Sequence, residues 1–150
     1  MGSSENVKKF TILLVEDNPG DVRLTKEAFK EGRLEIEIHD VGDGIEALDF
    51  LEKRNSYSHA PRPDLILLDL NLPRKNGREV LSVIKQNDRL KQIPVVILTT
   101  SSAESDIIES YYSFANCFIT KPINMDEFIE VAKAIERFWL STVQLPVKKT

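Results

Sequence analysis

The chain has 150 residues, of which 41% are hydrophobic and 29% are charged, so a disordered chain is excluded and one folded domain is expected. The net charge of −4, from 20 basic and 24 acidic side chains, argues against nucleic-acid binding by bulk charge. The single cysteine, Cys117, excludes a disulfide framework within the chain and favours a cytoplasmic location, and the apolar runs are shorter than the roughly 20 residues of a membrane helix.

The first part of the chain alternates between strand and helix patterns. Residues 10–15 form a short apolar run that predicts a strand. Asn18 followed by Pro19 is typical of a helix start, and Gly32 predicts that this helix ends near residue 31. Residues 34–39 alternate strictly between apolar and polar, which predicts a strand with one solvated face before a second helix that opens at Asp43.

The same alternation continues through the second part. Apolar runs at residues 65–69, 94–99 and 117–119 predict three further strands. Helices are predicted from residue 76, from the capping-box pattern at 101–104 and from a similar pattern at 124–127, the last reaching residue 139. Five strands that alternate with five helices indicate an α/β fold with a parallel sheet.

The strand compositions also predict the strand order. Strands covered on both faces are continuously apolar, which describes the first, third and fourth strands, whereas the alternating second and the short fifth suit sheet edges. This arrangement is the flavodoxin-like, doubly wound (βα)5 order 2-1-3-4-5. We expect a polar N-terminal segment at residues 1–9, one domain at 10–140 and a tail at 141–150.

Polar residues that could carry chemistry follow the strands. The carboxyl ends of parallel strands share one edge of the sheet, where sites of this fold class lie. Three carboxylates at that edge would need a cation, and oxygen ligands favour Mg²⁺. A lysine, a threonine and the metal could then hold a phosphoryl group, which the central aspartate could accept. The residues concerned are Glu16, Asp17, Asp69, Asn71, Thr99 and Lys121.

These strand-end motifs resemble those of response-regulator receiver domains in two-component signalling. The segments 15–18, 67–73, 98–100 and 120–122 occur in the same order and at the same spacing as the family's signatures. Pro61-Arg62-Pro63 and Phe138-Trp139-Leu140 are similar to small stand-alone regulators that serve cyanobacterial phytochrome kinases. The resemblance covers about residues 10–139.

The resemblance implies a role for each matching residue. Asp69 would accept the phosphoryl group, and Mg²⁺ would bind at Glu16, Asp17, Asp69 and the backbone carbonyl of Asn71. Thr99 and Lys121 would contact the phosphoryl group, and the bond between Lys121 and Pro122 would be cis. Phe118 stands where many receivers have a switching tyrosine, and it lacks the hydroxyl group that would anchor either position.

The resemblance implies a non-enzymatic switch rather than a catalyst. A sensor histidine kinase, of the phytochrome type by the closer likeness, would donate the phosphoryl group, and the signal would pass by conformational change and protein contact. No nucleic-acid or membrane partner is expected. The last helix and the tail carry apolar residues that predict a homodimer surface.

Three alternatives remain open at this point. A phosphatase of the haloacid-dehalogenase type also uses an aspartyl nucleophile, but it needs a second acid where this chain has Asn71. The segment 42–47 matches a G-x-G-x-x-A pattern for dinucleotide binding, although it follows the edge-like second strand. A receiver that binds partners without accepting phosphate is the third alternative.

Overall fold

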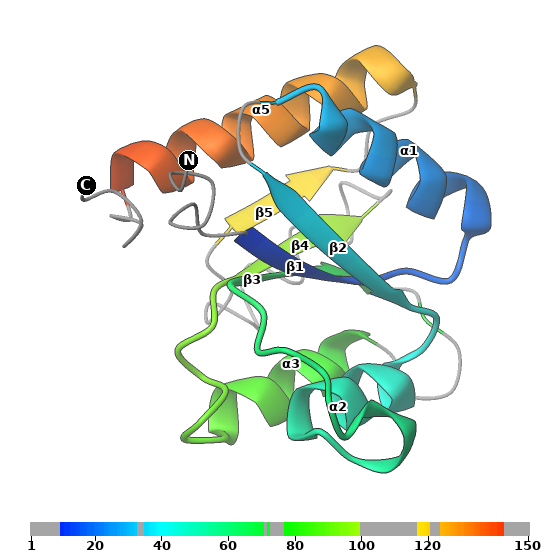
Figure 1. Ribbon diagram of the computed structural model, residues 1–150, viewed down its shortest axis with the longest axis vertical. Helices are drawn as coiled ribbons and strands as arrows, with labels where there is room; N and C mark the ends of the chain where they lie inside the picture. Colours follow the sequence, from blue (N-terminus) through cyan, green and yellow to red (C-terminus); the bar gives the residue numbers. More distant parts are fainter. Residues whose placement is uncertain are drawn as a thin grey trace, which may run out of the picture.

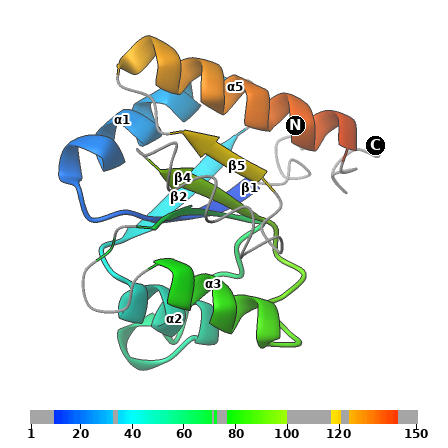
Figure 2. The same cartoon turned by 180° about the vertical axis from the view of Figure 1, so that it is seen from behind.

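The computed structural model describes residues 10–32, 35–70, 72, 77–99, 117–120 and 124–142. Five parallel strands form one sheet in the order β2-β1-β3-β4-β5, which confirms the predicted strand order. The edge strand β2 faces the viewer in Figure 1, and the opposite edge faces the viewer in Figure 2. The strands are β1 (Phe10–Val15), β2 (Ile36–Val41), β3 (Leu65–Asp69), β4 (Val95–Thr99) and β5 (Cys117–Thr120).

Helices cover both faces of the sheet. The helices α1 (Pro19–Lys30) and α5 (Met125–Thr142) lie together on one face, and α2 (Gly44–Glu52) and α3 (Gly77–Gln86) lie on the other (Figure 1). A short 3-10 helix, η2 (Asn55–Tyr57), follows α2. No helix in the described part of the chain is long and apolar enough to cross a membrane.

Alternate residues of the central strands enter two separate cores. Ile12, Leu14 and Leu67 pack toward α1 and α5, where Phe128 is also buried. The intervening side chains, such as Leu13 and Leu68, pack toward α2 and α3. Burying each large apolar side chain stabilises the fold by about 1.5–3 kcal/mol, so a central strand with both faces buried is held firmly in place.

Three polar side chains fix where helices begin. The Asn18 side chain accepts the Asp21 N–H at 3.0 Å and caps α1, which Pro19 opens as predicted. Asp43 accepts the Glu46 N–H at 2.8 Å at the start of α2. At the start of α5, the side chain of Asn124 accepts the Glu127 N–H at 2.9 Å. Each cap satisfies a backbone donor that the first helical turn leaves without a partner.

One local prediction is wrong and one is confirmed. The second strand runs from residue 36 to 41 and not from 34 to 39, because its register follows β1: Phe10 pairs with Ile36 and Val15 with Val41. The prediction that α1 ends near residue 31 is confirmed, since the helix runs to Lys30 and Glu31 is its C-cap. A Cβ at Gly32 would overlap the buried carboxylate of Glu136 on α5, so a larger residue there would require this side chain to move.

Other predicted features lie outside the described residues. They are the helix predicted to follow β4, the N-terminal segment 1–9 and the peptide bond between Lys121 and Pro122. The division into a domain at 10–140 and a tail at 141–150 stays a prediction, and α5 continues to Thr142.

Candidate functional site

The end of β1 supplies two of the predicted carboxylates. Glu16 follows the last residue of β1, and its N–H donates to the Val41 carbonyl at 3.0 Å, which extends the sheet by one bond. The Glu16 side chain is buried, whereas Asp17 is exposed. One carboxylate therefore lines the floor of the site and the next reaches solvent.

The third carboxylate comes from the neighbouring strand. Asp69 is the last residue of β3, and β3 pairs with β1 so that Leu68 lies beside Val15. This register carries Asp69 alongside Glu16. Asp69 is only 6% exposed, although an ionised carboxylate is rarely buried without partners or a metal.

Carboxylate oxygens of these three residues lie close together. One oxygen each from Glu16, Asp17 and Asp69 falls within 4.8 Å of the others. Hard oxygen ligands at this spacing suit a small divalent cation such as Mg²⁺, which usually keeps some of its water ligands. The residues present therefore fit the predicted metal site.

A hydrogen-bonded link orients the buried carboxylate. The Asn18 N–H donates to Glu16 Oε2 at 3.1 Å, and the Asn18 side chain caps α1. The Glu16 carboxylate thus lies beside the start of α1, where backbone N–H groups and the helix dipole favour negative charge. The sequence suggests Asn18 as a cap but gives no sign that its backbone also holds Glu16.

The start of α3 touches the backbone of Asp69 directly. The Gly77 N–H donates to the Leu70 carbonyl at 3.1 Å. A Cβ at Gly77 would overlap the Asp69 carbonyl oxygen and lie 2.6 Å from Leu70 Cα. Only a glycine lets α3 approach this closely. Sequence reasoning identified Gly77 as part of a helix start and missed this supporting contact.

The remaining predicted site residues are described less fully. Thr99 is the last residue of β4, next to β3, where Asp69 pairs with Leu98. Phe118 lies in β5 and pairs with Ile97. For Thr99 and Phe118 the structure describes the backbone only, and Asn71 and Lys121 lie outside the described residues.

The competing dinucleotide motif lies at a different place on the sheet. Gly42 and Gly44 follow the edge strand β2, and Asp43 between them caps α2. A Cβ at Gly42 would meet nothing within 4 Å, so this glycine is not needed for a close backbone approach. Asp43, between the two glycines, thus has a structural role as the helix cap.

Comparisons with known proteins agree with the fold. Residues 12–133 match the model of the response regulator receiver domain. The response regulator Rcp1 of Synechocystis sp. is 49% identical over 144 residues, covering 96% of this chain and 98% of that protein.

Two solved structures are also similar. The phosphorylated cyanobacterial phytochrome response regulator RcpA gives a TM-score of 0.83 at 50% identity, covering 93% of this chain and 99% of that one. The Mn²⁺-bound form of Rcp1 gives a TM-score of 0.80 at 50% identity, and the match covers 91% of this chain and 99% of that one. The chain therefore belongs to the response regulator receiver domain family, whose members are phospho-accepting switches in two-component signalling.

Proposed function

We propose that Asp69 is the residue that accepts the phosphoryl group. The single observation that carries this assignment is the acidic cluster, in which Asp69 stands at the end of β3 with Glu16 and Asp17 around it. An aspartate oxygen would attack phosphorus and form a P–O bond to give an acyl phosphate. The P–N bond to the donor histidine would break, and the imidazole nitrogen would keep the electron pair and take up a proton.

The cation that we assign to this cluster is Mg²⁺. Glu16, Asp17 and Asp69 would hold it with their carboxylates, together with the backbone carbonyl of Asn71. When bound, Mg²⁺ would neutralise charge on the carboxylates and on a phosphoryl oxygen. The similar protein Rcp1 has been solved with Mn²⁺ bound, which supports a divalent ion here.

The protein groups around the acceptor would hold and report the phosphoryl group. Lys121 would contribute a positive charge and Thr99 a hydroxyl donor. Movement of Thr99 toward the phosphoryl group would let Phe118 change position, so that a local change in charge biases a two-state element. The position of Thr99 at the end of β4, one strand from Asp69, supports this assignment.

We propose that this chain is cytoplasmic and that a sensor histidine kinase of the phytochrome type is its phosphoryl donor. The support for the kinase type comes from RcpA, a cyanobacterial phytochrome response regulator. This chain is 50% identical to RcpA. The chain would act as a switch and not as a catalyst, apart from slow loss of its own phosphate. Its output would pass through protein contacts, including a homodimer that uses the last helix and the tail.

Intact-protein mass spectrometry after incubation with acetyl phosphate tests the acceptor assignment. We expect one added phosphoryl group with Mg²⁺, none after chelation of the metal, and none in Asp69→Asn. Asp40→Asn is the matched control, because Asp40 is an exposed acid near the end of β2 that is not part of the cluster. Equal phosphorylation of Asp69→Asn, or no phosphorylation of the unmodified protein, would contradict the proposal.

A further inference from the structure

We propose that the edge strand β2 pairs antiparallel with β2 of a second copy of this chain, with the two-fold axis at Ile38. The sheet order ends at β2, and no strand in the described ranges lies on its outer side. In Figure 1 this strand crosses the front of the molecule, with α1 above it and α2 below. An open edge presents backbone donors and acceptors that a further strand can pair with.

The direction of the backbone groups follows from the bonds to β1. The carbonyls of Glu35 and Val41 accept the N–H groups of Phe10 and Glu16, at 2.9 and 3.0 Å. Because successive residues of a strand point their hydrogen-bonding groups to opposite sides, Ile36, Ile38 and Asp40 direct theirs outward. With the axis at Ile38, these outward residues pair with one another and can form six backbone hydrogen bonds between the copies.

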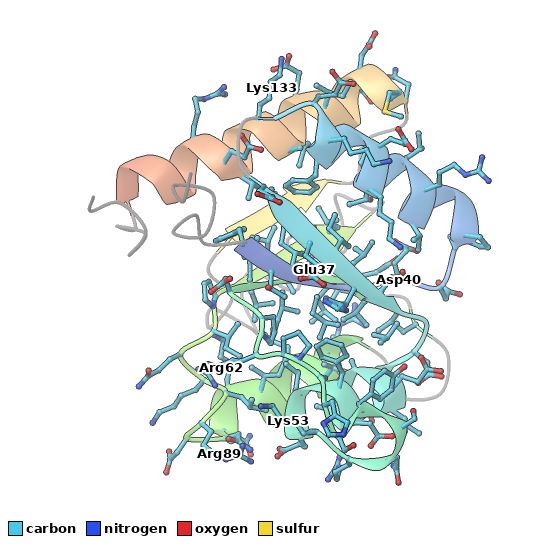
Figure 3. All side chains as sticks on the ribbon, viewed as in Figure 1. Glu37, Asp40, Lys53, Arg62, Arg89 and Lys133 are labelled. Atoms are coloured by element: carbon cyan, nitrogen blue, oxygen red, sulfur yellow. The ribbon has the colours of Figure 1, made fainter. Side chains whose placement is uncertain are left out.

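Avoidance of like charges favours this register. Glu37 Oε2 lies 3.2 Å from His39 Nε2 within one copy. With the axis at Ile38, Glu37 of each copy also lies opposite His39 of the other, so the imidazole can pair with a carboxylate of either copy. An axis at Glu37 would place two glutamates together, and an axis at Asp40 would place two aspartates together. Figure 3 shows Glu37 and Asp40 on the open strand, and the Glu37 and His39 side chains are 46% and 30% exposed.

The other face of β2 offers apolar surface beside the same axis. Ile36 and Ile38 are only partly buried against the core. Together with Lys26, Phe29 and Lys30 of α1 they line a groove of about 340 Å³. In the proposed register the two Ile38 side chains meet across the axis at this groove and would cover apolar surface that one copy leaves open.

One ion pair keeps a competing charge away from the apolar contact. Asp40 would lie opposite Ile36 of the second copy, which is an unfavourable neighbour for a free carboxylate. Lys26 Nζ lies 2.6 Å from Asp40 Oδ1, so α1 holds this carboxylate on its own copy. The proposed surface lies at the sheet edge opposite β5, so it is separate from the homodimer proposed through the last helix.

Site-specific cross-linking tests the register. In a Cys117→Ala background, Ile38→Cys would place two thiols at a hydrogen-bonded pair, where the Cα atoms lie about 5.5 Å apart, within the range that a disulfide spans. Mild oxidation should convert most of this variant into a covalent dimer. Asp40→Cys is the matched control, since its two copies would lie several residues apart along the paired strands and should cross-link at least tenfold less.

A charge swap tests the pairing without cysteines. We expect His39→Glu to weaken association in sedimentation experiments at least tenfold, because two glutamates would then face each other on each side. The double variant Glu37→His with His39→Glu again places an imidazole opposite each carboxylate and should restore association. Circular dichroism would check that both variants fold.

Three outcomes would overturn the proposal. They are equal cross-linking at positions 38 and 40, no cross-linking at position 38 in folded protein, and association that does not respond to the charge swap. A dimer formed only through the last helix would give the third outcome. Absence of cross-linking at position 38 would indicate that β2 does not pair with a second copy, and a strand from a different protein would then be the alternative partner.

Discussion

Replacing Gly77 with alanine tests whether α3 holds the end of β3 in place. The new Cβ would overlap the Asp69 carbonyl oxygen and lie 2.6 Å from Leu70 Cα. An ordinary contact with the nearer of these atoms, the Asp69 oxygen, would require the two backbone segments to separate by roughly 1 Å. Overpacking of this kind costs about 1–3 kcal/mol, and the better helix propensity of alanine returns at most about 1 kcal/mol. We expect the free energy of unfolding to fall by about 1–2 kcal/mol.

The same displacement should slow phosphorylation. Asp69 would have to attack phosphorus from a position shifted by most of an ångström, and misplacement of about 1 Å can cost roughly 100-fold in rate. We expect the initial rate with acetyl phosphate to fall about tenfold or more. The rate would be measured by intact mass at saturating Mg²⁺, and stability by urea unfolding followed with circular dichroism.

Gly42→Ala is the control for a glycine near the same end of the sheet. A Cβ there meets nothing within 4 Å, and no glycine in the described ranges has a positive φ. Both stability and phosphorylation rate should therefore stay close to those of the unmodified protein. The reasoning would be refuted if Gly77→Ala matched this control in both measurements.

Three further predictions follow from single contacts. Burial raises the pKa of Tyr57 above its usual value of 10.0, and the negative charge of Glu46 raises it further. The Glu46 carboxylate also accepts a hydrogen bond from the Tyr57 hydroxyl at 3.3 Å. The contribution of neutral Tyr57 to stability is fully present below pH 10 and is lost as the pH rises through the pKa of the folded state. NMR of labelled tyrosine should therefore show Tyr57 titrating at a higher pH than a free tyrosine, and Glu46→Gln should lower that pH. Asn124→Ala removes the acceptor of the Glu127 N–H and should lower the free energy of unfolding by about 1 kcal/mol in urea, while Asn124→Ser should restore most of it. Mg²⁺ at ten times its dissociation constant should stabilise the protein by about 1.4 kcal/mol, and Asp17→Asn should weaken this response in thermal unfolding; an equal response in that variant would contradict the cluster as the metal site.

The strand order and the acidic cluster could be predicted because they depend on strong local patterns. Strands buried on both faces must be continuously apolar, and this property identifies β1, β3 and β4 as the centre of the sheet. Once the order is known, the ends of β1 and β3 are neighbours. The closeness of Glu16, Asp17 and Asp69 then follows from chain topology and needs no detail of side-chain packing.

The bounds of β2 are harder to predict because an edge strand is constrained on one side only. The alternation at residues 34–39 is real, but it does not state which residue pairs with which on β1. The register places Ile36 beside Phe10 and ends with Val41 beside Val15. Val41 is the one fully buried residue of the strand, and its packing at the end of β1 determines the register more strongly than the alternation does.

The glycines show what a sequence pattern leaves out. Gly32 follows the end of α1 as predicted, and a Cβ there would also meet the Glu136 carboxylate of α5, more than 100 residues later in the chain. Gly77 likewise resembles an ordinary helix start, yet α3 meets the Asp69 backbone there. In both cases the missing side chain makes room for a group that belongs to another part of the fold. Local rules describe what glycine permits the backbone to do, whereas the need for close approach depends on the assembled fold, and at Gly77 that need lies directly beneath the proposed phosphoryl acceptor.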